Sequence, residues 1–142
     1  MDKYIDASQE AGKTFYQNFH DKGNLVMLNL LKFRVNADYT SLNELKPPRK
    51  ISGEEAYQLY LEKTLPLLKK AGSEIIYYGK SGSFLIGPST EKWDAVLLVK
   101  HESVMKFMEF AQTPAYLKIA GHRKAALEDS RLLPSHEIKE FI

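Results

Sequence analysis

The stretch 87–132, GPSTEKWDAVLLVKHESVMKFMEFAQTPAYLKIAGHRKAALEDSRL, decides the fold of this chain. It opens with a Gly-Pro turn and continues as a mostly apolar strand from Trp93 to Val99, after which a long helical pattern begins. Its polar cluster consists of His122, Arg123, Asp129 and Arg131. A strand followed by helices predicts an α+β domain, and the stretch contains no motif that identifies a reaction.

Helix signals divide the second half of this stretch. Ser103 is a helix N-cap candidate, and the pair formed by Thr113 and Pro114 restarts the helix, because proline is favoured at a first helical position behind a threonine cap. The pattern predicts a helix over Pro114–Asp129. A final strand is expected over Arg131–Phe141, interrupted early by Pro134.

Upstream, the first predicted elements are a helix over Ser8–Asp21 and a strand over Leu25–Phe33. The strand is apolar at nearly every position, which indicates burial on both faces. Asn29 is its one uncharged polar residue. The segment Arg34–Lys50, rich in asparagine and proline, is expected to be a loop that lies over the mouth of a pocket.

The next predicted helix begins behind Ser52 and stops at Gly72. Pro66 lies inside it and removes one backbone hydrogen bond, so a bend or break is expected there. The residues Ile75–Tyr78 favour a strand, and the apolar run in Ser83–Ile86 is expected to continue it as a hairpin or a bulged strand.

The order strand, helix, two strands, helix, strand is the pattern of the ferredoxin-like βαββαβ fold with an antiparallel sheet. We therefore expect one α+β domain over residues 1–142, in which residues 1–23 form an additional helical extension. Two helices cover only one face of a sheet, although the strands are apolar on both. The sequence therefore predicts a homodimer in which the second sheet face is covered by another copy.

Three segments carry a resemblance to a known family: Val26–Arg34, Gly87–Val99 and Thr113–Leu132. They resemble the uncharacterised domain of unknown function 1330 group of the dimeric α/β-barrel superfamily. The resemblance implies a ferredoxin-like dimer, to which the N-terminal helix and the loop before Lys50 are additions. Barrel relatives include cofactor-free monooxygenases, haem-binding enzymes and small-molecule isomerases, but fold analogy transfers no catalytic residue.

Composition excludes several classes of protein. The 142 residues are 44% hydrophobic and 27% charged with a net charge of +2, which fits an ordinary globular protein better than a nucleic-acid-binding one. No apolar run approaches the length of a membrane span and no signal-peptide pattern is present, so a cytoplasmic location is expected. The chain has no cysteine, and its four histidines show no ligand spacing. No metal and no cofactor are expected.

Six residues are candidates for ligand binding: Asn29, Tyr77, Trp93, Tyr116, His122 and Arg123. The hypothesis is a pocket between the sheet and the last helix, or between two sheets. It rests on Asn29, which interrupts an apolar strand face, and on Arg123, which shares an inward helical stripe with Tyr116. Tyr77 and Trp93 are candidates for stacking on a planar ligand, although aromatic residues in strands usually fill a core.

Each polar candidate also has a structural interpretation. Arg123 either anchors a substrate carboxylate or enolate, or pairs with one of the acids Glu128, Asp129 and Asp94. His122 is either a base or haem ligand, or a surface or capping group.

Two functions are favoured nearly equally. One is a cofactor-independent oxygenase or isomerase that acts on a small organic molecule, and the other is a non-catalytic ligand-binding or structural dimer. RNA binding ranks last, because the strand that begins at Trp93 lacks the pattern that stacks bases.

Overall fold

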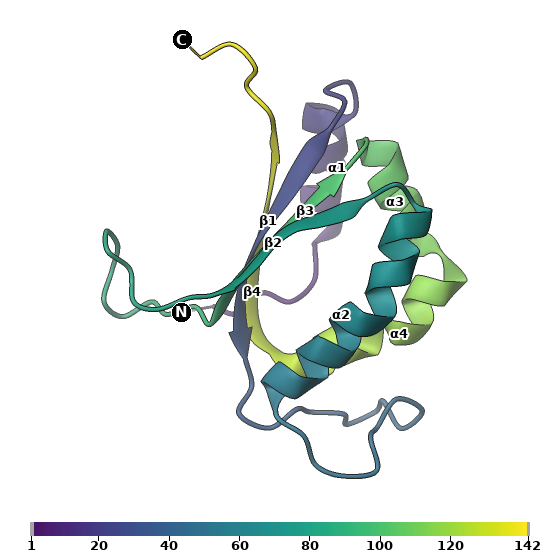
Figure 1. Ribbon diagram of the computed structural model, residues 1–142, viewed down its shortest axis with the longest axis vertical. Helices are drawn as coiled ribbons and strands as arrows, with labels where there is room; N and C mark the ends of the chain where they lie inside the picture. Colours follow the sequence, from purple (N-terminus) through teal and green to yellow (C-terminus); the bar gives the residue numbers. More distant parts are fainter. Residues whose placement is uncertain (1, 142) are drawn as a thin grey trace.

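Helices and strands alternate in the order expected for a ferredoxin-like chain (Figure 1). The structure is a computed structural model and describes residues 2–141. Its elements are α1 Gln9–Phe19, β1 Leu25–Phe33, α2 Gly53–Lys70, β2 Glu74–Lys80, β3 Ala95–His101, α3 Val104–Gln112, α4 Pro114–Ala126 and β4 Leu127–His136.

The four strands form one antiparallel sheet in the order β2-β3-β1-β4. This order places β1 between β3 and β4, so that Asn29 lies opposite Leu97 on one side and Leu132 on the other. The strand order and the antiparallel pairing are those of the ferredoxin-like fold. The predicted α+β class and the additional N-terminal helix are thereby confirmed.

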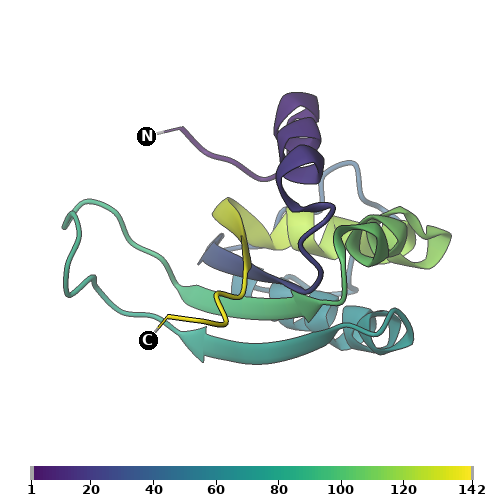
Figure 2. The same ribbon diagram turned by 90° about the horizontal axis from the view of Figure 1, so that it is seen from above.

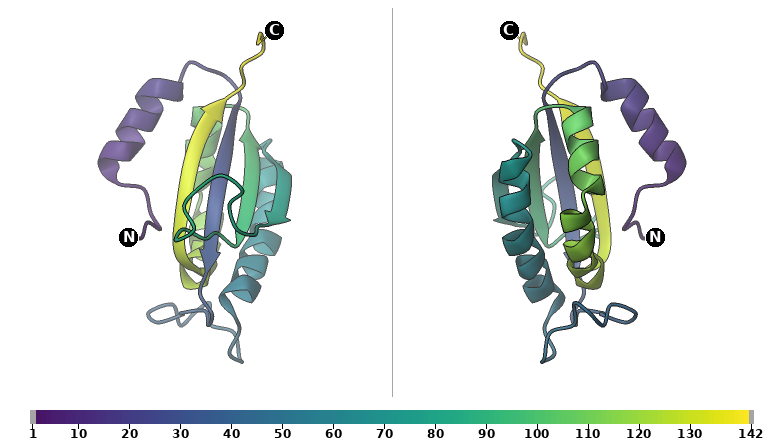
Figure 3. Two further views of the ribbon diagram at one scale, coloured as in Figure 1. Left: turned by 90° about the vertical axis from the view of Figure 1, so that its left-hand side faces the viewer. Right: turned by 90° about the vertical axis from the view of Figure 1, so that its right-hand side faces the viewer.

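The two faces of the sheet differ in burial. Along β1 and β3, the residues that face the helices are buried and the alternate ones are only partly buried. Helices α2, α3 and α4 lie over the buried face, whereas α1 lies beside the β4 edge (Figures 2 and 3). No helix among residues 2–141 lies over the other face, which we call the open face (Figure 3).

The cap residues read from the sequence begin the helices as expected. The Ser8 side chain accepts the amide of Ala11, and Ser52 forms a reciprocal capping box with Glu55. The Ser103 side chain accepts the amide of Lys106 at the start of α3, and the Thr113 side chain accepts the amide of Tyr116 at the start of α4. These bonds satisfy backbone amides that have no partner inside the helix.

The helix α2 continues through Pro66, so the predicted break is absent. Proline removes one backbone hydrogen bond, but packing holds the helix against the sheet on both sides of it. Thr64 and Leu68 flank the proline and are 3% and 4% exposed.

The predicted strand at Ser83–Ile86 is wrong. The strand β2 ends at Lys80, and the Ser81 amide donates to the Asp94 carbonyl, which closes the connection to β3. Because β2 pairs directly with β3, the residues between them form a loop, and Leu85 in that loop is 98% exposed. A register shift does occur in β2, between Ile75 and Tyr77.

The boundary between the last helix and the last strand also differs from the prediction. Helix α4 ends at Ala126 and β4 begins at Leu127, so Asp129 and Arg131 lie in the strand. Leu127 is fully buried and pairs with Phe33, and this packing ends the helix early. Pro134 is tolerated inside β4 because this strand lies at the edge of the sheet.

Candidate functional site

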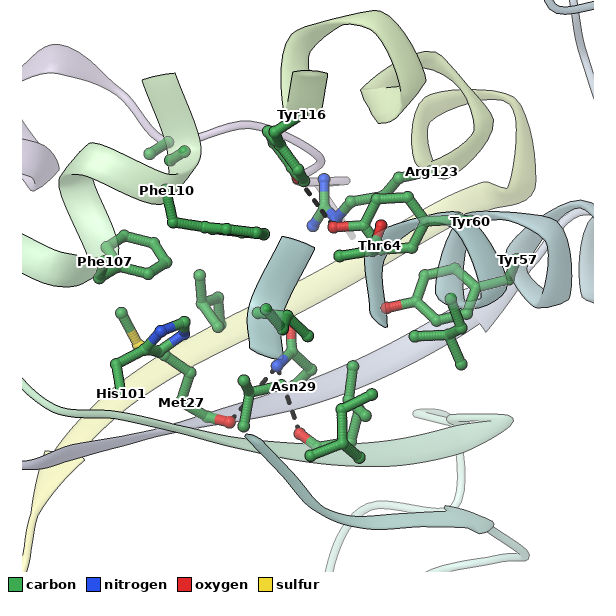
Figure 4. Close-up of a pocket in the computed structure, with 18 of the residues that line it drawn as sticks. Met27, Asn29, Tyr57, Tyr60, Thr64, His101, Phe107, Phe110, Tyr116 and Arg123 are labelled. Atoms are coloured by element: carbon green, nitrogen blue, oxygen red, sulfur yellow. Dashed lines mark hydrogen bonds between the residues drawn. The ribbon is translucent and has the colours of Figure 1, made fainter. Parts of the chain in front are cut away.

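A cavity of about 210 Å³ lies between the covered face of the sheet and helices α2, α3 and α4 (Figure 4). Its walls are mostly apolar and include Leu97, Val99 and the ring of Phe110. Its polar residues are Asp6, Asn29, Tyr57, Tyr60, Thr64, His101, Tyr116 and Arg123. Apolar walls with a few convergent polar groups are the usual composition of a small-molecule site.

Asn29 forms part of the cavity floor and is 8% exposed. Its side-chain nitrogen donates to the carbonyl oxygens of Met27 at 3.4 Å and Leu97 at 3.2 Å (Figure 4). These bonds use both amide hydrogens, so the amide oxygen is left as an acceptor. The polar residue in β1 is therefore held rigidly by the sheet.

Two tyrosines meet at the helix side of the cavity. The hydroxyls of Tyr60 from α2 and Tyr116 from α4 lie 2.8 Å apart, and one donates to the other. The acceptor in this pair keeps its own hydrogen, which needs a further acceptor. Burial raises the pKa of Tyr60 well above its ordinary value, and the neighbouring Tyr116 raises it further. The Tyr60 hydroxyl therefore stays protonated and serves as a donor.

Thr64 supplies a polar atom without a partner. Its side chain is 3% exposed, and its hydroxyl oxygen forms no hydrogen bond. The residue lies one turn after Tyr60 on α2 and lines the cavity. Because a buried hydroxyl without a partner is costly, a polar group in the cavity, from water or from a ligand, would stabilise this position.

Arg123 reaches the cavity from α4 and bonds to the N-terminal segment. One guanidinium nitrogen donates to the Ile5 carbonyl at 2.7 Å, and the other lies 3.5 Å from the Ser130 hydroxyl. No carboxylate within residues 2–141 lies within 4.0 Å of the guanidinium. The exposed Asp6 lines the mouth without pairing with it.

Of the two interpretations of Arg123, the ion pair is therefore wrong, because its three acidic candidates are engaged elsewhere. Their partners are Arg131 for Asp129 at 2.7 Å, Lys32 for Glu128 at 3.1 Å and the Phe33 amide for Asp94 at 2.8 Å. Burial opposes ionisation of Asp129, but hydrogen bonds from the Tyr4 amide, from Arg131 and from the Ser130 amide together lower its pKa below the ordinary value.

The N-terminal segment lies over the mouth of the cavity. Ile5, Asp6 and Ala7 line the opening, and the segment is fixed to β4 through Tyr4. The Tyr4 amide donates to Asp129 at 2.8 Å, and its carbonyl accepts from the Ser130 hydroxyl. These bonds hold the N-terminal segment against β4, which is far away in the sequence, and so place the segment over the cavity.

The loop Arg34–Lys50 does not cover the mouth, contrary to the prediction. Its Leu42 and Leu45 side chains lie against Gly121 on α4. The Tyr39 hydroxyl lies 2.7 Å from Nδ1 of His122, which joins the loop to the outer side of the same helix.

His101, the last residue of β3, lines the other end of the cavity and is 2% exposed. Its Nδ1 lies 2.8 Å from the Ser73 hydroxyl, and its ring stands edge-on to Phe107 at 4.9 Å. Burial lowers the pKa of His101 to about 4, so its imidazole is neutral at physiological pH. The sequence interpretation considered this histidine only as a metal ligand.

Comparison with known proteins identifies the family of the chain. The family "Domain of unknown function (DUF1330)" matches residues 48–133. The chain belongs to this DUF1330 family. No curated protein matches the chain.

Solved structures agree with this family and with the fold. The DUF1330 chain is 33% identical to RPA0582, a protein of unknown function from Rhodopseudomonas palustris, with a TM-score of 0.84 over 98% of this chain and 100% of that one. A dabb family protein with a ferredoxin-like fold from Mesorhizobium loti is 8% identical, with a TM-score of 0.52 over 82% of this chain and 98% of that one. At3g17210 from Arabidopsis thaliana is 12% identical, with a TM-score of 0.54 over 83% and 99% of the two chains. The latter two show likeness of fold alone.

The cavity of the DUF1330 chain brings together three of the six sequence candidates. Asn29, Tyr116 and Arg123 line it, whereas Tyr77 and Trp93 do not. Tyr77 is paired with Leu98 on the open face and is 55% exposed. The expectation that one pocket in the chain includes Tyr77 and Trp93 is therefore wrong.

Trp93 and His122 have structural contacts instead. The indole of Trp93 donates to Glu91 at 2.9 Å, and the guanidinium of Arg131 lies 5.0 Å from the ring. His122 is 3% exposed and bonds to Tyr39 away from the cavity. Burial lowers the pKa of His122, and the positive charge of Lys63 lowers it further. These contacts are structural for both residues, but His122 is buried and is therefore not the surface or capping group of the sequence interpretation.

Sequence reasoning missed Tyr60, Thr64 and the pair formed by Ser73 and His101. Tyr60 and Thr64 lie on the inward face of α2, where the helical period of the sequence predicts core residues. Each carries a hydroxyl group on an otherwise apolar helical stripe, and this signal could have identified them as cavity residues. Arg123 was identified by a polar group on such a stripe. The Ser73–His101 pair joins the end of α2 to the end of β3, and no sequence spacing indicates it.

Among residues 2–141, no three side chains of histidine, cysteine, aspartate or glutamate are grouped to hold a metal ion. In the same range, every helix is too short or too polar to cross a membrane.

The buried imidazole of His101 should weaken folding as the pH falls from 6.5 toward about 4. Above 6.5 the imidazole is neutral in both states, but between these values the unfolded chain binds a proton that the native protein excludes. The loss reaches about 3 kcal/mol near the lower pH. Urea unfolding across this pH range should show a steeper decline in the free energy of unfolding for the wild type than for His101→Gln. The glutamine keeps a polar partner for Ser73. Parallel curves would contradict this prediction.

Proposed function

We propose that this DUF1330 protein binds a small organic anion with an apolar body in the cavity between its sheet and helices. The observation that carries the proposal is Arg123, a cation that lines an apolar cavity without a carboxylate partner among residues 2–141. A guanidinium in such surroundings favours a carboxylate or an enolate, with which it forms charge-assisted hydrogen bonds.

The shape and polarity of the cavity restrict the ligand. A volume of about 210 Å³ lies below the ~300–1,000 Å³ of typical ligand pockets, so the ligand must be small. Arg123 and the Tyr60–Tyr116 pair offer donors at one end, and the Asn29 amide oxygen offers an acceptor on the floor. An aromatic or branched aliphatic carboxylate with a second acceptor oxygen satisfies the donors at this end.

Benzoylformate tests the proposal, because it combines a carboxylate, a keto oxygen and a small apolar ring. At about 100 times its Kd, it should stabilise the folded protein by roughly 2.7 kcal/mol, measured as a rise in Tm. Benzoylformamide has nearly the same shape without the charge and should produce a much smaller rise. Equal shifts from both compounds, or no shift from benzoylformate and other aromatic or branched aliphatic carboxylates, would contradict an anion site.

Two kinds of function use such a cavity: a cofactor-independent enzyme and a non-catalytic binding protein. The neutral His101 imidazole, which lines the same cavity as Arg123, favours the enzyme. Among the two reactions expected for an enzyme, isomerisation requires only proton transfer, which this residue set can perform.

We further propose that the protein is a homodimer joined through the open faces of two sheets. The open face carries partly buried or exposed apolar residues on all four strands. They are Val26, Leu28, Leu30, Tyr77, Val96, Leu98 and Leu133. A contiguous apolar sheet face of this kind is typical of a protein interface, and a second copy offers a face of the same chemistry.

A further inference from the structure

His101 and Arg123 lie toward opposite ends of the same cavity (Figure 4). Arg123 lies beside Tyr60 and Tyr116 at the helix end, whereas His101 lies beside Phe107. Apolar side chains separate the two ends. A ligand held through an anionic head at Arg123 therefore extends its body toward the imidazole.

The His101 ring has one protein partner and one nitrogen that needs another. Nδ1 bonds to the Ser73 hydroxyl at 2.8 Å, and the other ring nitrogen, Nε2, has no hydrogen-bond partner within residues 2–141. The residue is 2% exposed and lines the cavity, so its surroundings are almost entirely the protein and the cavity. The unbonded hydroxyl of Thr64 in the same cavity independently indicates a polar occupant.

Ser73 allows the imidazole to change its protonation state. A hydroxyl donates to Nδ1 in one neutral tautomer, and it accepts from the Nδ1 hydrogen in the other tautomer and in the protonated ring. By rotating, the Ser73 hydroxyl therefore remains a hydrogen-bond partner of His101 in both neutral tautomers and in the protonated form. No carboxylate forms an ion pair with the ring in the described part of the chain, and the neighbouring Glu102 is exposed. Because Ser73 occupies Nδ1, proton exchange with a ligand takes place at Nε2, the other ring nitrogen of this cavity residue.

We infer that His101 is the acid–base residue of this cavity and that Ser73 positions it, with a small enolisable α-keto acid as the substrate. The inference rests on the proposed anion site. Arg123 binds the carboxylate, and the adjacent keto oxygen lies within the donor group formed by Tyr60 and Tyr116. The carbon next to the keto group then extends along the apolar walls toward His101.

The reaction is a tautomerisation that needs no co-reactant. His101 Nε2 removes a proton from the carbon next to the keto group, and the electron pair of that C–H bond forms a carbon–carbon double bond. The carbonyl π electrons move to the oxygen, and the tyrosine hydroxyls donate hydrogen bonds to the resulting enolate. The protonated imidazole then returns a proton to the enolate oxygen, which gives the enol and restores neutral His101.

Hydrogen–deuterium exchange of α-ketoisocaproate tests the step. In D₂O, the protein should exchange the hydrogens next to the keto group faster than buffer does, measured by NMR. His101→Gln should lower the protein-dependent rate by about 100-fold or more while benzoylformate, which has no exchangeable hydrogen, still binds. Ser73→Ala should retain binding but lower the exchange rate and shift its pH profile, because the ring loses its partner.

The outcomes separate this inference from the proposed function. If neither keto acid binds to the wild type, the inference fails, and the proposed function fails with it only when the other aromatic and branched aliphatic carboxylates do not bind either. Binding without exchange above the buffer rate, or undiminished exchange in His101→Gln, overturns the role of His101 alone. If that variant does not fold, the ¹⁵N-labelled wild type decides: the imidazole with NOEs to Phe107 should shift when benzoylformate binds, and an unmoved resonance overturns the inference.

Discussion

Arg123→Met is expected to weaken benzoylformate binding by about 30-fold to 5,000-fold, measured by calorimetry. The substitution keeps an unbranched side chain in the cavity but removes the guanidinium. The ligand carboxylate would then be buried in apolar surroundings without its charged partner, which typically costs 2–5 kcal/mol. The fold should be much less affected, because no carboxylate within residues 2–141 depends on Arg123.

The loss of folding free energy should be about 1.5 kcal/mol, which corresponds to the bond donated to the Ile5 carbonyl at 2.7 Å. A structural arginine that left a buried carboxylate unpaired would instead cost roughly 3–5 kcal/mol. Lys124→Met is the matched control, since Lys124 is the next residue on α4, is exposed and does not line the cavity. Equal binding losses in both variants, or a large stability loss with unchanged binding, would remove Arg123 from the site.

Local signals in the sequence were sufficient to predict the elements that set the fold. Ser52, Ser103 and Thr113 begin helices because their side chains bond to backbone amides within the same turn. The end of α4 was missed because it depends on tertiary packing. The burial of Leu127 against the core begins β4 before the helical pattern of the sequence ends.

The site was predictable where a polar residue interrupts a regular apolar pattern, as Asn29 and Arg123 do. It was not predictable where the pattern itself is irregular. Ile75 faces the helices, so regular alternation would turn Tyr77 to the same side. The register shift in β2 reverses the orientation of the side chains that follow it. Tyr78 pairs with Leu97 on the helix-covered face, and Tyr77 lies on the open face.

Leu98→Asp is expected to convert the proposed dimer to a monomer without unfolding it. Leu98 lies on the open face of β3, opposite Leu28 of β1, where it is only partly buried in the single chain. In a symmetric dimer each interface residue occurs twice, so two carboxylates would be buried. At about 2 kcal/mol each, the cost is roughly 4 kcal/mol, which raises the dimer Kd about 1,000-fold.

Light scattering coupled to size separation should give twice 16.2 kDa for the wild type and 16.2 kDa for Leu98→Asp, while circular dichroism shows the same helix content for both. Met27→Asp is the contrasting variant, because Met27 is 3% exposed and packs beneath α1 and α3 on the opposite face. A carboxylate there should destroy folding and, with it, association. A wild type that stays monomeric at micromolar concentration, or a Leu98→Asp protein that remains fully dimeric, would exclude the open face as the interface.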